Sequence, residues 1–301
     1  MFCRILVVRG GAVGDFIVTL PVWAALREAF PNAELGGLVS ADRGELGNYA
    51  GVFEHYRCVD DLEWASFFVP AGELDERAVE WLSGFDAIIS YLHDPDGVWE
   101  DNVKRVWRGE WISGPGLPPD NENQSISKKL LEPLKAWGIA GANFEPCLTL
   151  PNQADSLYAL GAHPGSGSRA KNWPETCWEQ FLQHSLVMER GGILLIAGEA
   201  EQDRLGWIES MVGDQGEIHF GKSLLETAHA LRQCRLFVGH DSGITHLAAA
   251  LGVRCLVLWG ETNRDVWRPP QDHVTVLDGG KELKEISVDA LLAAVAAAGS
   301  R

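Results

Sequence analysis

Four polar residues stand together between two apolar segments in the stretch GHDSGITHLAAALGV, Gly239–Val253. They are Asp241, Ser242, Gly243 and His246. A strand pattern precedes them and a helix pattern follows, so the backbone N–H groups of Ser242, Gly243 and Ile244 would be the unpaired donors of a helix start. Such donors at the positive end of a helix suit a phosphate group. A helix cap alone would explain Asp241 or Ser242 but not all four residues, and His246 would either contact the anion or brace the loop.

A second glycine-rich turn follows another apolar segment, in GAHPGSGSRAKNWP, Gly161–Pro174. It offers backbone N–H groups and a hydroxyl at Gly165 and Ser166, and two cations, Arg169 and Lys171. Glycine N–H groups and cations in this arrangement form phosphate sites, although the Walker A spacing is absent. The alternative is a solvated turn that happens to be basic.

An acid at a helix start follows the first apolar strand, in RGGAVGDFIVTLP. Asp15 is either a favourable first-turn acid, worth ~0.3–1 kcal/mol, or a group facing a cleft, because Gly11 and Gly14 leave the backbone around it uncovered. A carboxylate that a helix N-terminus keeps ionised can accept a proton. The glycine spacing does not match the dinucleotide motif G-x-G-x-x-G, and no acid ends the second strand near Ser40, which argues against NAD.

Three further sites follow strand patterns and are expected at the carboxyl edge of a sheet. Glu199 and Glu201 would accept hydrogen bonds from ribose hydroxyls, or would be charges in a first helical turn. Trp259 offers an aromatic face on which a base could stack. His93 and Asp94 would hold sugar hydroxyls or would belong to a plain loop.

Apolar strands and helices alternate along the chain in two successive series, which predicts two doubly wound α/β domains. The segment Glu145–Asp155 carries two prolines and no clear periodicity, so the boundary is placed there, between residues 1–150 and 151–301. One helix is expected from about Asp15 to Phe30, and another over SISKKLLEPLKAWG, ending at Gly138. Ligands of such folds bind at the carboxyl ends of strands or in the cleft between domains.

The composition is that of an acidic globular protein. The 301 residues are 46% hydrophobic and carry a net charge of −17. Residues 1–150 hold 12 Lys and Arg against 23 Asp and Glu, and the remaining residues hold 13 against 19. Neither half therefore has the basic surface of a nucleic-acid-binding protein. The same charge argues against strong adsorption to anionic lipid and leaves at most a peripheral membrane contact.

The expected localisation rests on the absence of a membrane-span pattern and a signal-peptide pattern from the sequence. No apolar run approaches the ~18–20 residues of a membrane span, and the N-terminus has no signal-peptide pattern, so a cytoplasmic protein is expected. The six cysteines form no C-x-x-C pair, and most lie in apolar strand or helix patterns. They are expected to be buried and reduced rather than to form disulfides or a zinc site.

The motifs together resemble those of glycosyltransferase family 9, the ADP-heptose:lipopolysaccharide heptosyltransferases. The resemblance rests on four segments in matching order: GGAVGDFIVTLPVWAAL, HPGSGSRAKNWP, HDSGITHLAAALGV and LWGETNRDVWRP. It implies the GT-B architecture, in which two Rossmann-like domains flank an interdomain cleft that holds the active site. The nucleotide donor would bind mainly the C-terminal domain and the acceptor mainly the N-terminal domain.

The same resemblance implies roles for individual residues and a type of reaction. Transfer would be inverting, would need no catalytic metal, and would use no cofactor beyond the nucleotide-sugar substrate. By motif, Asp15 matches the general base, Lys171 a cation on the donor phosphates, Asp241, Ser242, Gly243 and His246 the nucleotide-phosphate loop, and Glu201 or Glu199 the ribose contact, with Glu201 favoured.

We therefore predict an enzyme that transfers a sugar from a nucleoside-diphosphate donor to a saccharide or glycolipid acceptor in lipopolysaccharide or other surface-glycan synthesis. The sugar is expected to be a heptose, the donor ADP-heptose and the product ADP. The alternatives are a GT-B nucleotide-sugar epimerase or hydrolase and a non-catalytic nucleotide-sugar-binding protein. The sequence does not specify the acceptor, the linkage or the oligomeric state.

Overall fold

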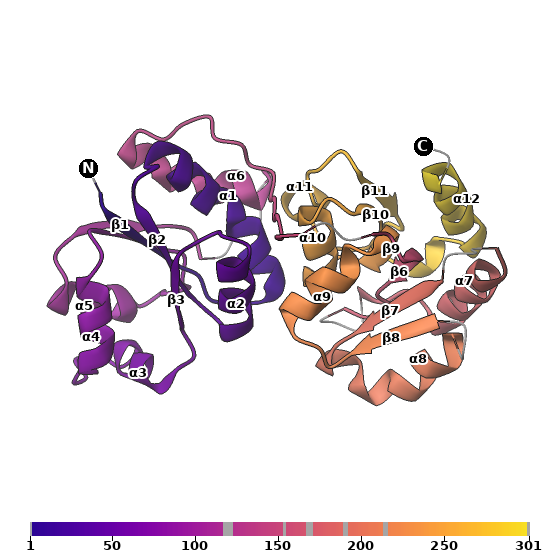
Figure 1. The fold of residues 1–301 in the computed structure, drawn as a ribbon, viewed down its shortest axis with the longest axis horizontal. Coiled ribbons are helices and arrows are strands. Elements are labelled where there is room, and N and C mark those ends of the chain that lie inside the picture. Colours follow the sequence, from indigo (N-terminus) through magenta and orange to yellow (C-terminus); the bar gives the residue numbers. More distant parts are fainter. Residues whose placement is uncertain are drawn as a thin grey trace. The chain divides into compact units, whose positions relative to one another are not determined.

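The chain folds into two compact units, Met1–Phe144 and Glu145–Arg301, each built on one parallel sheet (Figure 1). This computed structural model describes residues 2–116, 123–152, 155–166, 171–188, 192–212 and 216–299, with backbone only for residues 186–188. Each unit has its own hydrophobic core, which is the mark of a domain.

The segment that follows Phe144 belongs to the second unit. The Leu148 N–H donates to the Ala250 carbonyl at 2.8 Å, and the Gln271 side chain donates to the Pro146 carbonyl at 2.7 Å. Leu148 itself is only 4% exposed. The structure therefore divides the chain at Phe144, at the start of the proline-containing segment, whereas the sequence set the division at residue 150.

The sheet of the first unit has five parallel strands in the order β3-β2-β1-β4-β5. They are β1 (Arg4–Val8), β2 (Glu34–Val39), β3 (His55–Cys58), β4 (Ala87–Ser90) and β5 (Glu110–Ser113). Ile5 in the central strand lies beside Leu35 on one side and Ala87 on the other. Ile5–Val8 of β1 and Ala87–Ile89 of β4 are apolar and buried, as expected of parallel strands covered on both faces.

Helices connect these strands, and one of them departs from its predicted course. They are α1 (Val13–Ala29), α2 (Ala41–Tyr49), α3 (Leu62–Ala65), α4 (Glu76–Ser83), α5 (Val98–Val106) and α6 (Ile126–Leu131), with 3₁₀ segments η1 (Ser66–Phe68) and η2 (Glu132–Trp137). The single helix predicted to end at Gly138 is instead α6 followed by η2. Pro133 has no N–H to donate, so the α-helical hydrogen bond to the carbonyl four residues earlier is lost at this point.

Aromatic side chains fill the core on one face of this sheet. Trp64, Phe67 and Trp99 are at most 1% exposed, with ring centroids between 5.5 and 6.1 Å apart. They pack against Leu6 and Ile88 of the central strands. Tilted aromatic pairs of this kind stabilise a core beyond the area that they bury. Through Trp99 they join α5 to this core.

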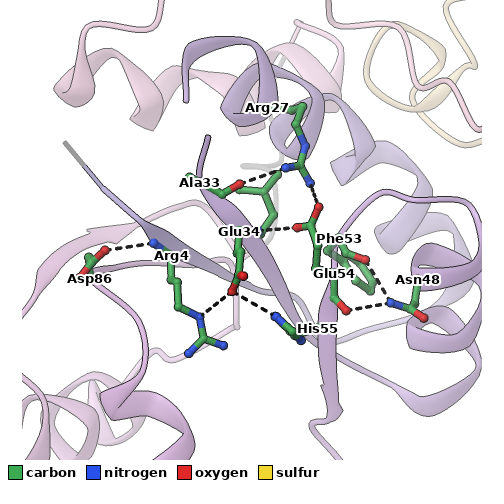
Figure 2. Close-up of polar contacts among 10 residues, drawn as sticks. Arg4, Arg27, Ala33, Glu34, Asn48, Phe53, Glu54, His55 and Asp86 are labelled. Atoms are coloured by element: carbon green, nitrogen blue, oxygen red, sulfur yellow. Dashed lines mark hydrogen bonds and ion pairs between the residues drawn. The ribbon is translucent and has the colours of Figure 1, made fainter. Parts of the chain in front are cut away.

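Paired charges close the amino edge of the same sheet, as Figure 2 shows. Glu34 lies 3.2 Å from both the Arg4 and the His55 side chains. Glu54 accepts hydrogen bonds from Arg27 at 2.6 Å and from the Leu35 N–H at 2.7 Å. These acids are thus committed to structural contacts, and in this unit it is the opposite, carboxyl edge that is left for a ligand.

The sheet of the second unit has six parallel strands in the order β11-β10-β9-β6-β7-β8. They are β6 (Tyr158–Ala162), β7 (Ile193–Ala197), β8 (Gly216–Phe220), β9 (Cys234–His240), β10 (Arg254–Trp259) and β11 (Val274–Asp278). Leu160 of β6 lies between Ile193 and Leu236.

Helices cover both faces of this second sheet (Figure 1). They are α7 (Glu175–Met188), α8 (Leu205–Val212), α9 (Leu224–Leu231), α10 (Gly243–Ala250), α11 (Arg264–Trp267) and α12 (Val288–Gly299), with 3₁₀ segments η4 (Glu199–Arg204) and η6 (Leu283–Glu285). Trp178 of α7, Ile208 of α8 and Leu291 of α12 share one core cluster with β6 and β9. α9 and α10 lie on the other face.

Both units are Rossmann-like, which confirms the predicted fold class. In each, the chain leaves a central strand first to one side and then to the other, and the strand order reverses between β1 and β4 and between β6 and β9. Ligands of open α/β sheets bind at the carboxyl ends of the strands at such a reversal. Within the described ranges, no helix combines the length and the apolar character needed to cross a membrane.

The cysteines depart in part from the prediction. All six are free thiols, but only Cys234 and Cys255 are buried, whereas Cys3 and Cys147 are exposed. Burial raises the pKa of Cys234 to about 12. The expected burial is wrong for Cys3 and Cys147 because they lie just before β1 and in the segment between Phe144 and β6 rather than inside strands or helices.

Candidate functional site

The strand reversal of the first unit carries Asp15. This residue is the third of α1, is 24% exposed, and accepts the Ala12 N–H at Oδ2 over 2.8 Å. Gly11 has φ +94°, and a methyl group on it would lie 2.5 Å from the same carboxylate oxygen. Gly14 is the second residue of the helix. The loop after β1 therefore requires glycine where the Asp15 carboxylate approaches it.

Arg9 holds the other oxygen of Asp15 and was not predicted from the sequence. Its guanidinium donates to Asp15 Oδ1 at 2.8 Å and to the Tyr91 and Gly116 carbonyls at 3.1 and 3.2 Å. Arg9 is 4% exposed. Burial lowers the pKa of Arg9 from its usual value, and the attraction to Asp15 opposes that shift. An arginine directly after the apolar run Ile5–Val8 was the available signal.

The structure assigns Asp94 a structural contact. Its carboxylate accepts the Trp99 N–H at 3.1 Å and the Glu100 N–H at 3.0 Å, so it caps α5. His93 and Asp94 also line a cavity of about 210 Å³ with Trp111. Of the two predicted readings of Asp94, the structure supports the loop residue and helix cap.

The carboxyl edge of the second sheet brings Lys171 and Asp241 together. Lys171 Nζ donates to Asp241 Oδ2 at 2.8 Å, and the two side chains are 43% and 10% exposed. Asp241 directly follows β9, and Lys171 lies in the connection between β6 and α7. Two segments that are 70 residues apart in the chain thus meet at the strand reversal.

Helix α10 begins at this point. Ser242 is its N-cap, and Ser242 Oγ accepts the Thr245 N–H at 3.3 Å. Gly243 and Ile244 are the first two residues of the helix, so their N–H groups are the donors that a helix cannot use itself. His246 is 6% exposed, and this burial favours a brace for the loop over a ligand contact.

A buried polar cluster supports the same loop and was not predicted. His163, directly after β6, is 5% exposed and lies 3.6 Å from Glu201 Oε2 and 3.5 Å from Ser242 Oγ. Burial would raise the pKa of Glu201, but His163, the Gly198 N–H and Arg204 more than offset this, so the pKa lies below its usual value. The cluster joins the ends of β6, β7 and β9.

The two acids predicted at the ribose differ in accessibility. Glu201 is 3% exposed and accepts the Gly198 N–H at 2.9 Å, and a methyl group on Gly165 would overlap its Oε1. Glu199, at the start of η4, is exposed. In this structure Glu201 therefore holds the loop, and Glu199 is the more accessible of the pair.

His240 fixes both ends of the glycine-rich turn. It is fully buried, its Nδ1–H donates to the Gly165 carbonyl at 3.1 Å, and its Nε2 accepts the Trp173 N–H at 2.9 Å. Burial lowers the pKa of His240 to about 3, so the ring is neutral. Ser166 donates to Asn172 Oδ1 at 2.7 Å across the same turn. Arg169, predicted here, lies outside the described residues.

Trp259 does not present a stacking face. The ring is 1% exposed and its N–H donates to the Thr262 carbonyl at 2.7 Å. The predicted contact with a base is therefore wrong for this arrangement, because Trp259 ends β10 as a core residue. Among the described residues, no three His, Cys, Asp or Glu side chains are grouped as the ligands of a metal would be.

Comparison with known proteins identifies related chains. The sequence profile of glycosyltransferase family 9 (heptosyltransferase) matches residues 145–291, beginning where the second unit begins. Lipopolysaccharide heptosyltransferase 1 of Pseudomonas aeruginosa is 24% identical over 86% of this chain and 79% of its own length.

Two solved structures share the fold over 98% of this chain. A family 9 glycosyl transferase from Veillonella parvula has a TM-score of 0.80 and 17% identity, with 96% of its own chain covered. The E. coli heptosyltransferase WaaC, solved with ADP-2-deoxy-2-fluoro heptose, has a TM-score of 0.77 and 18% identity, with 99% covered. Both units thus follow the GT-B pattern of these enzymes.

Proposed function

The chain belongs to glycosyltransferase family 9 and is therefore a glycosyltransferase, and we propose that it transfers a heptose from ADP-heptose to a saccharide acceptor of lipopolysaccharide or another surface glycan. The reaction inverts the anomeric carbon and uses no metal ion and no cofactor. The observation that carries the proposal is the pairing of Lys171 with Asp241 at the N-terminus of α10, inside the region that the family profile matches.

The donor half of the site belongs to the second unit. A diphosphate would accept the N–H groups of Gly243 and Ile244 at the positive end of α10, while Lys171 supplies an ammonium group. Each hydrogen bond to a charged phosphate contributes about 1.5–3 kcal/mol. Such local contacts can hold an anionic donor although the chain carries a net charge of −17. The E. coli relative WaaC was solved with ADP and with an ADP-heptose analogue, which supports this choice of donor.

The acceptor half belongs to the first unit. Asp15 takes the proton of an acceptor hydroxyl as that oxygen bonds to the anomeric carbon of the heptose. The bond from the anomeric carbon to the phosphate oxygen breaks, and ADP leaves with the electron pair. Attack on the face opposite the leaving group inverts the anomeric carbon. Lys171 and the N-terminus of α10 stabilise the charge that develops on the departing diphosphate.

A panel of nucleotide ligands distinguishes an ADP-linked donor from donors that carry another nucleotide. Thermal shifts with ADP, UDP, GDP, CMP and NAD should show stabilisation by ADP, amounting to about 2.7 kcal/mol when its concentration is 100-fold above Kd. ADP-heptose should then release ADP in the presence of heptose-free lipopolysaccharide. A response to UDP alone would remove the ADP-heptose donor. ADP binding without turnover on heptose-free lipopolysaccharide and on other surface-glycan acceptors would favour a non-catalytic binding protein, and conversion of the sugar without an acceptor would favour an epimerase or hydrolase.

A further inference from the structure

Arg9 makes four hydrogen bonds from a buried position at the end of β1. Besides Asp15 Oδ1 and the Tyr91 and Gly116 carbonyls, its Nε donates to the Asp15 backbone carbonyl at 3.3 Å. The guanidinium thus contacts both the side chain and the backbone of Asp15. It also reaches the segments that follow β4 and β5.

Stability alone does not explain a charged pair at this position. The Arg9 side chain is 3% exposed, so its guanidinium has lost nearly all of its contact with water. Buried ion pairs can often be replaced by apolar residues without loss of stability, because removing charges from water costs several kcal/mol per ion. The neighbouring residues of β1, Ile5 to Val8, are apolar and fully buried. An apolar residue at position 9 would continue that core.

Arg9 helps to fix the orientation of the Asp15 carboxylate. One carboxylate oxygen accepts from Arg9 and the other from the Ala12 N–H, each at 2.8 Å. A carboxylate has about four lone-pair positions, so each oxygen keeps one for a substrate hydroxyl. The positive φ of Gly11 brings the loop against the second oxygen. The carboxylate is therefore held from two sides and remains 24% exposed.

We propose that Arg9 is a positioning residue for the general base. It fixes the carboxylate of Asp15 in one orientation and ties that orientation to the segments after β4 and β5. Gly116, which accepts from Arg9, packs so closely on His93 that a methyl group would lie 2.8 Å from its Cα. The proposal rests on the role of Asp15 proposed above.

Arg27 provides a matched control in the same unit. Its guanidinium also donates to a carboxylate, Glu54 Oε1 at 2.6 Å, and to a carbonyl, Ala33 O at 3.0 Å, but at the amino edge of the sheet (Figure 2). Arg9→Gln, Arg9→Lys and Arg27→Gln should be compared with the wild type. The assay follows ADP release from ADP-heptose with heptose-free lipopolysaccharide, as kcat and as KM for the donor.

Arg9→Gln is expected to lower kcat on the order of 10- to 100-fold, because a small misplacement of a reacting group has effects of this size. The KM for ADP-heptose should stay within about 2-fold, since the donor contacts of the second unit are unchanged. Arg9→Lys should restore part of the loss, and Arg27→Gln should leave kcat unchanged. In an Asp15→Asn background, Arg9→Gln should cause no further loss, because Arg9 acts through Asp15.

An equal loss in both backgrounds, or a change confined to KM, would overturn the proposal. If Asp15→Asn alone retains the wild-type kcat, the proposed function fails in its assignment of Asp15 as the general base. The positioning claim is then decided separately by a crystal structure of Arg9→Lys, the milder variant. The Asp15 carboxylate should have turned away from the Ala12 N–H or should occupy more than one rotamer, and an unchanged carboxylate would refute the claim.

Discussion

Lys171 is the residue at which the donor site can be tested most simply. Its ammonium group is 43% exposed, whereas the Asp241 carboxylate that it contacts is 10% exposed. An ion pair of this exposure adds only about 0–1 kcal/mol to stability. The pairing therefore matters less for folding than for the direction in which it holds the ammonium group, beside the first turn of α10.

Replacing Lys171 by alanine should weaken the binding of ADP about 10-fold or more, because a hydrogen bond to a charged group is worth about 1.5–3 kcal/mol. Adenosine, which lacks the phosphates, should bind as tightly as to the wild type. Titration calorimetry with both ligands measures the difference. Lys222→Ala, an exposed lysine of the same unit, is the control. An equal loss for adenosine would exclude a phosphate contact.

At the scale of elements, the site depends on where β6, β7 and β9 end. The sequence predicted the turn between β9 and α10, because apolar runs flank its polar residues on both sides. It could not predict that His163, Glu201 and Ser242 meet, because that contact depends on the order β9-β6-β7 within the sheet. Chain order alone does not determine strand order.

Other elements also show that features set by neighbouring residues were predictable, whereas features set by tertiary contacts were not. Pro133 ended α6 for a local reason, the missing N–H, and the sequence contained that signal. Trp259 resembled a stacking residue because it follows an apolar strand, but its burial depends on residues packed around the end of β10. Two partners of Arg9, Tyr91 and Gly116, lie 82 and 107 residues away, so the contacts of Arg9 beyond Asp15 could not be predicted from the local sequence.

His240 gives the β6–α7 connection a predictable response to pH. Burial lowers the pKa of His240 to about 3 in the folded chain, from an ordinary value of 6.5. Below pH 6.5 His240 therefore binds a proton in the unfolded chain but stays neutral in the folded chain. The free energy of unfolding falls as the pH is lowered. The slope from this residue is at most about 1.4 kcal/mol per pH unit. This slope continues until the pH approaches the pKa of His240 in the folded chain.

Urea unfolding between pH 6.5 and 5 measures this slope together with that of His219, whose pKa burial also lowers. The lowered pKa of Glu201 costs stability only at lower pH, as that carboxylate is protonated. His240→Gln should be less stable at pH 7 and should lose much of the slope in this window. His184→Gln, at an exposed position of α7, should keep the slope. A wild-type slope in His240→Gln would show that another group is responsible.

At the scale of the whole molecule, the proposed donor site and the proposed acceptor site are assigned to different units. Each has a parallel sheet with its own strand reversal, and the proposed donor and acceptor groups belong to different units. The net charge of −17 does not oppose an anionic donor, because the helix end and Lys171 act locally. Both sheets and their order of elements were predictable from alternation alone.

Binding of ADP should therefore protect only one unit from amide hydrogen exchange. The amides of Gly243 and Ile244 and those near Lys171 should exchange more slowly when ADP is present. The amides of β1 to β5 and the Asp15 loop should exchange at the rate of the free protein. Mass spectrometry of exchanged peptides measures both. Protection centred on the Asp15 loop would place the nucleotide on the wrong unit and contradict the assignment.

The most direct test of the account is the effect of Asp15→Asn on transfer and on ADP affinity, measured in the same preparation. Loss of a general base should lower the rate of ADP release from ADP-heptose by about 10²–10⁴-fold, while the Kd for ADP stays within about 2-fold of the wild type. Asp42→Asn, which changes a first-turn acid of α2 that also pairs with an arginine, should leave both quantities unchanged. Wild-type transfer by Asp15→Asn would contradict the account.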